Sequence, residues 1–397
     1  MTHSPINSPL ISVVIPVRNS PEFLRKCVAH LTASTYDNIE IIVVDDASTD
    51  NTAEIAESLQ VRVVRLNSQT GPAGARNLGV DAAQGEFVFF IDADVCVHAD
   101  TVEKLVDTFV KTPDVDAVFG SYDLKPYVSN VISQYKNLFH HYVHQQACEE
   151  ASTFWSGCGA VRRKVFLEMG GFDTSYGRPC IEDVELGVRL YQAGKSILLN
   201  KSIQVTHLKR WTLWGLIKTD FWDRGVPWTE LMLRSGKIQN DLNLKFSQRI
   251  CAIMAVSILV MLMIGVWQSP VLLLLMLTGL LSLQLLDWWT LSQGPPFWIR
   301  LLGVCLTASV VLGSILHFQL AAIIVFALHL MIVIINYKFY LFFAREKSLL
   351  FAALVVPLHF TYYLYSVASF ATGIVLHIWK TRLAPVLTFR NSSANRC

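Results

Sequence analysis

The segment 87–94, with the sequence FVFFIDAD, decides the fold that we expect for the N-terminal half of this chain. Its five apolar residues predict a strand that is buried on both faces, as in a parallel sheet. Strand alternation points Asp92 and Asp94 the same way, at the edge where open α/β sheets bind ligands. Two converging carboxylates repel each other unless a cation holds them, and oxygen ligands suit Mg²⁺ or Mn²⁺ bound to a substrate's phosphates. A solvated acidic turn with Asp94 capping the next helix is the alternative for this motif alone.

The composition of the chain changes near residue 250. Up to Ile250 there are 25 Lys and Arg and 29 Asp and Glu, whereas from Cys251 onward only ten charged residues remain, eight of them basic. Three stretches of this second half contain no charged residue, namely 251–286, 301–337 and 348–379. Apolar stretches longer than about 18 residues are typical of membrane spans. We expect about four or five spans or interfacial helices, with 336–347 as a candidate for lying along the interface.

The net charge and the N-terminal sequence restrict where the protein is expected to be located and what it is expected to bind. The net charge of +2 argues against a nucleic-acid partner, and the eight cysteines have no metal-binding spacing. Residues 1–11 lack the basic and apolar regions of a secretory signal. We therefore expect a multi-pass protein of the cell (inner) membrane with its N-terminal domain in the cytoplasm.

The soluble half alternates short apolar runs with amphipathic segments, which predicts helical crossovers and a mostly parallel, Rossmann-like sheet. The expected strands are 11–17, 40–44, 61–66, 87–91 and 117–122. The expected helices are 21–32, 53–59, 74–83, 101–110 and 182–193. The domains expected are an N-terminal tail (1–10), an α/β domain (11–240) and an all-α membrane domain (241–397).

Two further motifs precede the FVFFIDAD segment. The strand at 40–44 ends in Asp45 and Asp46, where one carboxylate has the chemistry to accept from the N–H of a nucleotide base. The segment 71–77 (GPAGARN) opens a helix with small residues, which allows close backbone approach, and its Arg76 is placed to meet a phosphate or to organise the acids. Each motif alone is more often explained by packing or helix capping.

Taken together and in this order, these motifs resemble the family 2 glycosyltransferases, which have the GT-A nucleotide-diphospho-sugar transferase fold. The resemblance covers roughly residues 10–230. It continues in the segments 157–163 (GCGAVRR) and 170–173 (GGFD), and in Glu182-Asp183 at the start of a helix. It implies an enzyme that transfers a sugar from a UDP- or GDP-sugar donor.

The resemblance implies a role for each matching residue. Pro16, Arg18 and Asp46 lie where family members hold the nucleoside base, with Arg76 nearby. Asp92 would contact the ribose or sugar, Asp94 would bind the divalent metal, and Asp183 would be the general base. His207 matches a further metal or diphosphate contact, and a structural histidine is the equally weighted alternative. With one base and no second nucleophile, the implied reaction is a single displacement with inversion.

One block departs from the pattern of membrane-embedded relatives that extend polysaccharides. Where these carry Gln-x-x-Arg-Trp, this chain has FWDRGVPW at 221–228, so that only Arg224 matches. Arg224 remains a candidate diphosphate contact, while the stretch 209–222 has the basic and aromatic mixture of an interfacial helix. We expect a membrane-associated acceptor, a glycolipid or polyprenyl-linked glycan. The alternatives are a processive polysaccharide synthase and, less favoured, a non-catalytic membrane scaffold.

Overall fold

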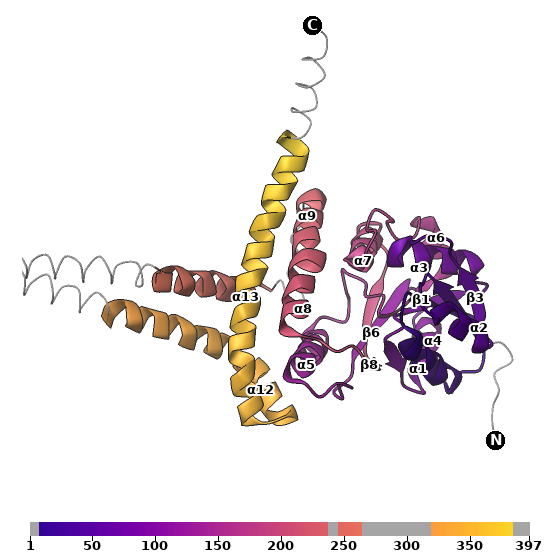
Figure 1. Cartoon of the computed structure of the whole chain (residues 1–397), viewed down its shortest axis with the longest axis horizontal. Helices are drawn as coiled ribbons and strands as arrows, with labels where there is room; N and C mark the ends of the chain where they lie inside the picture. Colours follow the sequence, from indigo (N-terminus) through magenta and orange to yellow (C-terminus); the bar gives the residue numbers. More distant parts are fainter. Residues whose placement is uncertain (1–7, 237–244, 264–318, 384–397) are drawn as a thin grey trace, which may run out of the picture. The chain divides into compact units, whose positions relative to one another are not determined.

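The computed structural model describes residues 8–236, 245–263 and 319–383, and Figure 1 shows how their elements are arranged. The strands are β1 (Ile11–Val17), β2 (Ile39–Asp45), β3 (Arg62–Arg65), β4 (Phe87–Ile91), β5 (Val95–Val97), β6 (Ala117–Tyr122), β7 (Cys158–Arg162) and β8 (Ile197–His207). The helices up to residue 235 are α1 (Pro21–Thr32), α2 (Thr52–Ser58), α3 (Gly71–Ala82), α4 (Thr101–Lys111), α5 (Val131–Gln146), α6 (Arg163–Glu168), α7 (Glu182–Gln192), α8 (Leu213–Lys218), the π-helix η1 (Thr219–Gly225) and α9 (Val226–Ser235). The later helices are Phe246–Met263, Gln319–Ile335, α12 (Tyr337–Glu346), α13 (Leu349–Ile378) and η3 (Trp379–Leu383).

The eight strands form one mixed sheet in the order β3-β2-β1-β4-β7-β6-β8-β5. The pairs from β3 to β4 are parallel, as is β6 with β8, whereas β7 and β5 run antiparallel to their neighbours. The expected α/β fold of the GT-A type is thus confirmed, and the parallel part is the part whose connections are helical crossovers. Only three residues separate β4 from β5, too few for a crossover to a parallel neighbour.

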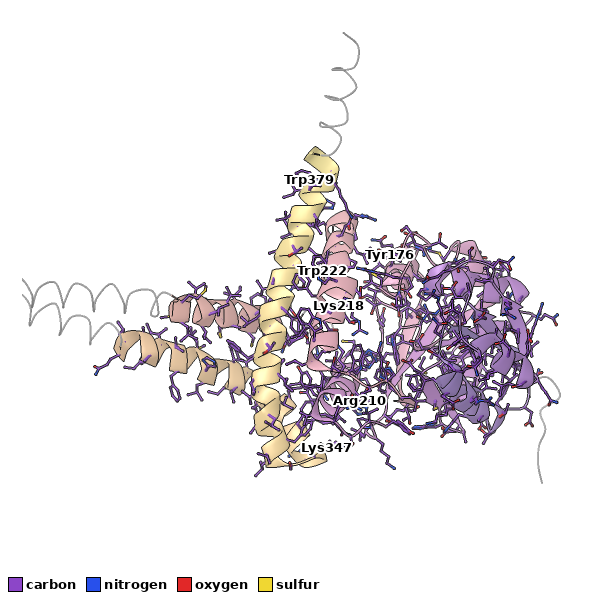
Figure 2. All side chains as sticks on the ribbon, viewed as in Figure 1. Tyr176, Arg210, Lys218, Trp222, Lys347 and Trp379 are labelled. Carbon is purple, nitrogen blue, oxygen red and sulfur yellow. The ribbon has the colours of Figure 1, made fainter. Side chains whose placement is uncertain are left out.

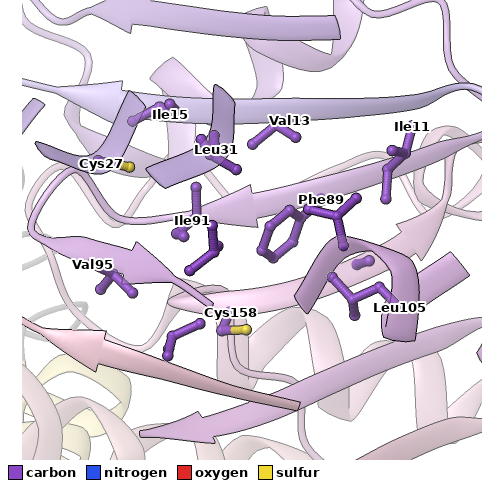
Figure 3. Close-up of a cluster of buried hydrophobic side chains, with 14 of the residues drawn as sticks. Ile11, Val13, Ile15, Cys27, Leu31, Phe89, Ile91, Val95, Leu105 and Cys158 are labelled. Atoms are coloured by element: carbon purple, nitrogen blue, oxygen red, sulfur yellow. The ribbon is translucent and has the colours of Figure 1, made fainter. Parts of the chain in front are cut away.

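Helices cover both faces of the sheet. On one face α1, α2 and α4 pack against a core that includes Val13, Phe89 and Ile91 (Figure 3). On the other face α3, α6 and α7 pack against the alternate residues of the same strands, such as Val14 and Phe90. All five residues of β4 are buried, as the sequence predicted, because this central strand has a helical layer on each side.

The structure adds elements that the sequence pattern did not predict. Helix α5, strand β7 and helix α6 lie between 131 and 168, where the hydrophobic periodicity is weak. Helix α5 carries histidine and asparagine on its buried side. The face that packs against the sheet is therefore not apolar enough to be recognised from the sequence. This helix supplies several residues of the candidate active site.

The C-terminal part of the chain contains helices that are long and apolar enough to cross a membrane. Among the described residues these are Phe246–Met263 and Leu349–Thr381, and a third span results if Gln319–Ile335 and Tyr337–Glu346, which are bent by 65° at Asn336, count as one. The expected four or five spans fall partly on 264–318, outside the described residues. The bend at Asn336 gives 337–346 a different direction from the apolar helix before it, and the interfacial placement of this segment stays a prediction.

The described residues divide into two compact units by their contacts. The first contains the mixed sheet and its helices together with Phe342–Val355 and the part of α13 from Ala368 onward. The second contains Phe246–Leu341 and Val356–Val367. Its core includes Cys251, Ile332 and Tyr363, and the Tyr363 hydroxyl donates to Gln248 Oε1 at 2.6 Å.

Candidate active site

Asp92 and Asp94 lie in the short turn between β4 and β5, at the tip of the central strand. The Val95 N–H donates to the Asp92 carbonyl oxygen at 3.0 Å and so closes the turn. The two carboxylates bind different partners. Asp92 accepts from Arg76 on α3, whereas Asp94 faces His207 at the end of β8. The acidic pair is therefore divided between two halves of the site, which the sequence spacing alone does not reveal.

Sheet register brings Asp94 and His207 together although they are far apart in sequence. Val95 pairs with His207 in the antiparallel β5–β8 ladder, and the Leu208 N–H donates to the Asp94 carbonyl oxygen at 2.8 Å. His207 Nε2 lies 3.5 Å from Asp94 Oδ2. Burial pushes the pKa of Asp94 upward, but the hydrogen bond and charge of His207 outweigh this and hold the pKa below its ordinary value.

The imidazole of His207 is held by two neighbours. Its Nδ1 lies 2.8 Å from Asn137 Oδ1, and its ring stacks on Tyr122 with centroids 4.5 Å apart. Because the side-chain oxygen of Asn137 can only accept, Nδ1 donates to it, and Nε2 is the nitrogen that faces Asp94. A metal ion would take the place of the contact between Nε2 and Asp94, and an oriented second nitrogen is usual for histidines that bind metal.

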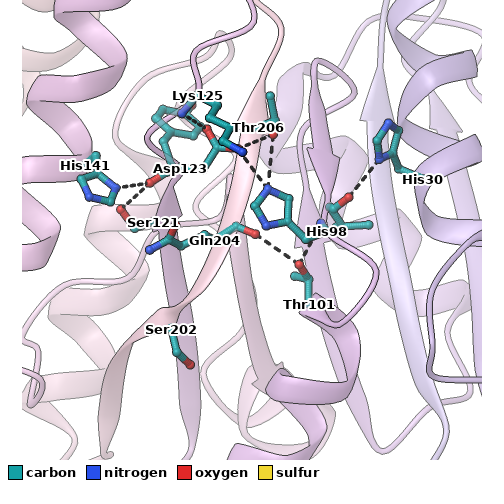
Figure 4. A network of polar contacts seen from close by, with 12 residues as sticks. His30, His98, Thr101, Ser121, Asp123, Lys125, His141, Ser202, Gln204 and Thr206 are labelled. Atoms are coloured by element: carbon teal, nitrogen blue, oxygen red, sulfur yellow. Dashed lines mark hydrogen bonds and ion pairs between the residues drawn. The ribbon is translucent and has the colours of Figure 1, made fainter. Parts of the chain in front are cut away.

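A network of polar contacts beside the site fixes the strands that carry Tyr122 and His207 (Figure 4). His98 Nε2 lies 3.0 Å from Asp123 Oδ2, and the hydroxyl of Thr206 donates to the same carboxylate oxygen. Asp123 follows Tyr122 directly, and Thr206 precedes His207. This network therefore connects the end of β6 to β8 and to the segment after β5. Its contribution to the site is to hold the strands that carry Tyr122 and His207 in position.

Arg76 joins the donor side of the site to the start of α7. Its guanidinium is buried and pairs with Asp92 Oδ1 at 2.7 Å and with Glu182 Oε1 at 2.8 Å. Burial alone lowers the pKa of Arg76, but the two carboxylates more than reverse this and raise it, so the side chain stays charged. The structure thus shows Arg76 paired with two of the acids, and the contact with a phosphate stays a prediction.

Asp183 begins α7 next to Glu182 and accepts three hydrogen bonds. The Ser156 N–H and hydroxyl both donate to Oδ2, at 3.0 and 3.1 Å, and the Val184 N–H donates to Oδ1 at 2.8 Å. Burial and the neighbouring charge of Glu182 raise the pKa of Asp183 to about 6, against the lowering effect of Ser156, Arg76 and Val184. A carboxylate with this pKa is suited to general-base catalysis near neutral pH.

Pro16, Arg18 and Asp46 lie at the carboxyl ends of the neighbouring strands β1 and β2. Arg18 is exposed, and Asp46 accepts from the Thr70 and Gly71 N–H groups at 2.6 and 2.9 Å, at the start of α3. Within the described part of the chain no ion pair or hydrogen bond joins these three side chains to Arg76. The preceding Asp45 is fully buried, and its Oδ1 accepts no hydrogen bond from any described residue.

Arg224 lies on the π-helix η1 and pairs with Asp220 Oδ1 at 3.0 Å. Asp220 also accepts from Lys136 Nζ at 2.8 Å, which fastens η1 to α5. Burial lowers the pKa of Lys136 to about 8, against the opposing effect of Asp220. The charge of Arg224 acts on Asp183 and Tyr122, so Arg224 belongs to the same electrostatic environment as Asp183.

The helices around η1 carry exposed aromatic and basic side chains, as the sequence predicted for an interfacial segment. Trp214 is 74% and Trp222 47% exposed, and Lys218 and Trp222 are labelled in Figure 2. Trp211 differs from this expectation. It is buried, its backbone N–H donates to the Ser133 hydroxyl, and Lys209 Nζ lies 4.4 Å from its ring centroid.

Several residues of this site escaped the sequence reasoning. Asn137, Tyr122 and Ser156 hold His207 and Asp183, but each stands in a segment without a motif. Their signal is a contact between distant segments, which a single sequence does not contain. The Ser156 segment was noticed only for the glycines that follow it.

A divalent metal fits the pair Asp94 and His207, but only with help from a ligand. No three His, Cys, Asp or Glu side chains form a metal cluster among residues 8–236, 245–263 and 319–383. One carboxylate oxygen and one imidazole nitrogen at 3.5 Å are the spacing of neighbouring ligands on one ion. Such a two-residue site leaves most coordination positions to the oxygens of a diphosphate and to water.

Comparison with known families agrees with this geometry. Residues 12–170 match the family described as glycosyl transferase family 2. This part of the chain is a family 2 glycosyltransferase domain. The match extends from β1 through Asp92, Asp94 and Ser156, and α7 with Asp183 follows it.

The chain is also similar to curated relatives and to solved structures. The chain is 42% identical over 120 residues to the glycosyltransferase GlyG of Streptococcus pneumoniae, which is 29% of this chain and 40% of that protein. It thus spans less than half the length of this curated relative. A mannosyltransferase of Pyrobaculum calidifontis, solved with GDP-Man and Mn²⁺, covers 94% of this chain and 88% of its own at 16% identity and a TM-score of 0.49. S. aureus TarS 1-349, solved with UDP-GlcNAc, covers 57% and 65% at 19% identity and a TM-score of 0.45.

Proposed function

We propose that this protein is an inverting, metal-dependent glycosyltransferase that moves a sugar from a nucleotide-sugar donor to a membrane-associated acceptor. The observation that carries the proposal is the buried Arg76, which pairs with both Asp92 and Glu182. It connects the carboxylates at the tip of β4, where a donor would bind, to Asp183 on α7, where a base would act. Asp92, in the proposed donor site, is thus connected through Arg76 to Glu182, the neighbour of the proposed base.

The donor is expected at the carboxyl ends of β1, β2 and β4. Asp45 and Asp46 offer acceptors for a base N–H, and the free Oδ1 of Asp45 favours Asp45 because a buried oxygen without a donor costs free energy. Pro16 and Arg18 would flank the base, and Asp92 would contact the ribose or sugar. Arg224, whose side chain is 43% exposed, is the candidate contact for the diphosphate.

Mg²⁺ or Mn²⁺ would be held by Asp94 Oδ2 and His207 Nε2. When bound, the ion neutralises the charge that develops on the diphosphate as the anomeric bond breaks. Asp94 remains ionised at neutral pH because its pKa is lowered, and Asn137 accepts from Nδ1 of His207, so that Nε2 is the nitrogen that faces Asp94. A bound metal would displace any proton on Nε2.

Asp183 would take the proton of the acceptor hydroxyl. An alcohol is a weak nucleophile, so the transfer needs a carboxylate within hydrogen-bond reach of its oxygen. The other carboxylates nearest to Asp183 already have partners, since Asp92 and Glu182 are paired with Arg76 and Asp94 faces His207. A single displacement, with inversion at the anomeric carbon, follows from one base.

The membrane-associated acceptor is inferred from the rest of the chain. Two or three of the described helices are long and apolar enough to cross a membrane, and the α8–η1 segment exposes tryptophan and lysine. Tryptophan and lysine are typical of the lipid headgroup region. A glycolipid or polyprenyl-linked glycan at a cell membrane, reached from the cytoplasmic side, is the acceptor that this arrangement favours.

Two other functions remain as alternatives. A processive polysaccharide synthase is disfavoured because 221–228 lacks the Gln-x-x-Arg-Trp block. A non-catalytic scaffold is disfavoured because all four acids Asp46, Asp92, Asp94 and Asp183 are present. Product length separates the first alternative, since a single transfer gives one added sugar and a synthase gives a ladder of sizes.

The test is transfer from labelled donors by membranes that contain the full chain. A panel of UDP- and GDP-sugars is incubated with Mn²⁺, with Mg²⁺, or with excess chelator, and lipid-extractable label is counted. We expect label from at least one donor, loss of this label with chelator, and inversion in the product. Absence of transfer from every donor, in the presence of an acceptor-containing lipid extract, would contradict the proposal.

Replacing Asn137 with leucine is expected to weaken metal use. Without the Asn137 oxygen the His207 ring loses its fixed tautomer and orientation, and loss of such a partner typically costs about 10–100-fold in metal affinity. The measurement is the Mn²⁺ concentration that gives half-maximal transfer. Gln145→Leu on the same helix is the control, because Gln145 donates to the Lys201 carbonyl oxygen, away from His207. An unchanged Mn²⁺ requirement in Asn137→Leu would remove His207 from the metal site.

A further inference from the structure

Ser156 makes an unusual double contact with the candidate base. Its backbone N–H and its hydroxyl both donate to the same oxygen, Oδ2 of Asp183, at 3.0 and 3.1 Å. Ser156 is only 2% exposed, so water does not compete for its hydroxyl. A buried hydroxyl that donates to a carboxylate makes a stronger hydrogen bond than one between two neutral groups.

The two carboxylate oxygens of Asp183 accept different numbers of hydrogen bonds. A carboxylate has about two acceptor positions on each oxygen. Oδ2 has both filled by Ser156, whereas Oδ1 accepts only from the Val184 N–H among the described residues. One acceptor position therefore remains, and it is on Oδ1.

Close backbone packing fixes the distance between Ser156 and Asp183. Gly187, one helical turn after Asp183 on α7, has no room for a side chain, because a Cβ there would lie 2.1 Å from the Phe154 nitrogen. The segment that carries Ser156 therefore lies directly against α7 on the face of Asp183. The double contact is a consequence of this backbone fit.

We propose that Ser156 is a positioning residue that saturates Oδ2 of Asp183 and directs proton transfer to Oδ1. The inference rests on the proposed function and goes beyond it in naming the oxygen that acts and the residue that selects it. In the transfer step the acceptor O–H gives its proton to Oδ1, and the acceptor oxygen forms the bond to the anomeric carbon. The bond from that carbon to the nucleoside diphosphate breaks, and its electron pair leaves with the diphosphate.

The charged groups that face Asp183 set the background for a test by pH. Glu182 on α7 opposes its ionisation, and Arg76 on α3 and Arg224 on η1 favour it. None of these changes when Ser156 is replaced by alanine. Loss of the hydroxyl removes a donor that favours the ionised form, so the pKa of Asp183 should rise.

The first arm measures unfolding and needs no substrate. Tm of the full chain in detergent is measured at pH 5 and pH 8 for the wild type, Ser156→Ala, Asp183→Asn and the double variant. Asp183 is ionised at pH 8 and largely protonated at pH 5 because its pKa is about 6. We expect Ser156→Ala to lower Tm by about 3–8 °C at pH 8 and clearly less at pH 5. The difference between the two pH values should vanish in the Asp183→Asn background.

Ser121→Ala is the matched control, because Ser121 is also buried but its hydroxyl donates to the Tyr122 carbonyl oxygen. Its effect on Tm should be the same at both pH values. An effect of Ser156→Ala that is equally independent of pH would overturn the inference, since a purely structural serine would behave in that way.

The second arm measures transfer with the donor that the panel identifies. We expect Ser156→Ala to move the acid limb of the pH–rate profile upward by about half to one unit and to lower kcat about 5–10-fold, with the donor KM unchanged. Wild-type transfer with an identical profile in Ser156→Ala would overturn the inference and leave the proposed function intact. Absence of wild-type transfer from every donor would overturn both.

Discussion

Replacing Asp183 with asparagine is expected to lower kcat about 10²–10⁴-fold, which is the usual contribution of a general base. Asparagine has nearly the same size but cannot take a proton at neutral pH. The donor KM should change little because Asp183 contacts Ser156 and Val184 and no residue of the donor side. The measurement is steady-state transfer by the full chain over a range of donor concentrations.

The pH profile gives a second readout of the same residue. Burial and Glu182 raise the pKa of Asp183 to about 6 from its ordinary 3.8. Because the base acts in its ionised form, the rate should fall about tenfold for each pH unit below 6 and level off above it. The residual activity of Asp183→Asn should lack this limb. Asp107→Asn, at an exposed ion pair on α4, should behave as the wild type. A variant Asp183→Asn with near-normal kcat would exclude Asp183 as the base.

Replacing Arg76 with methionine is expected to reduce the free energy of unfolding by about 3–5 kcal/mol. Methionine fills a similar volume, but it leaves Glu182, which is only 4% exposed, without its cation. Loss of one partner of a buried ion pair is costly because the remaining charge stays away from water. For a domain of this size the change corresponds to a decrease in Tm of about 6–20 °C. Thermal unfolding of the full chain in detergent measures it.

Two further variants separate charge from packing. Arg65→Met removes an arginine whose ion pair with Glu54 is exposed, and such pairs contribute about 0–1 kcal/mol, so Tm should hardly change. Adding Glu182→Gln to Arg76→Met should restore part of the lost stability, because the uncompensated buried charge disappears. If the double variant were less stable than Arg76→Met alone, the loss would come from packing of Arg76 against Phe172 and not from charge.

Much of the N-terminal architecture follows from local pattern. Helix α1 has the predicted bounds Pro21–Thr32, and β4 is buried on both faces as expected. These segments have strong periodicity and flanking turn residues, so short-range chemistry suffices. The segment from 131 to 168 was not predicted because α5 turns polar residues inward, and their partners lie on other elements.

For the candidate site too, the local sequence pattern predicted some features and the contacts between elements decided the others. The sequence placed Asp92 and Asp94 at a strand tip and Asp183 at a helix start, and the structure has both there. The sequence did not predict that the two aspartates have different partners, because strand alternation with a period of two places both side chains on the same face. Asp92 and Asp94 differ only through Arg76 on α3 and His207 on β8.

The sequence by itself determined which residues carry charge, which strands are buried and where the apolar half begins, since composition and periodicity act over a few neighbouring residues. Only the tertiary structure decided the partners. The β5–β8 register puts His207 beside Asp94, the fold of α3 against α7 puts Arg76 between Asp92 and Glu182, and the absence of a side chain at Gly187 puts Ser156 on Asp183. Contacts between different elements, up to a hundred or more residues apart as for Arg76 and Glu182, depend on packing of the whole domain, and no local pattern encodes them.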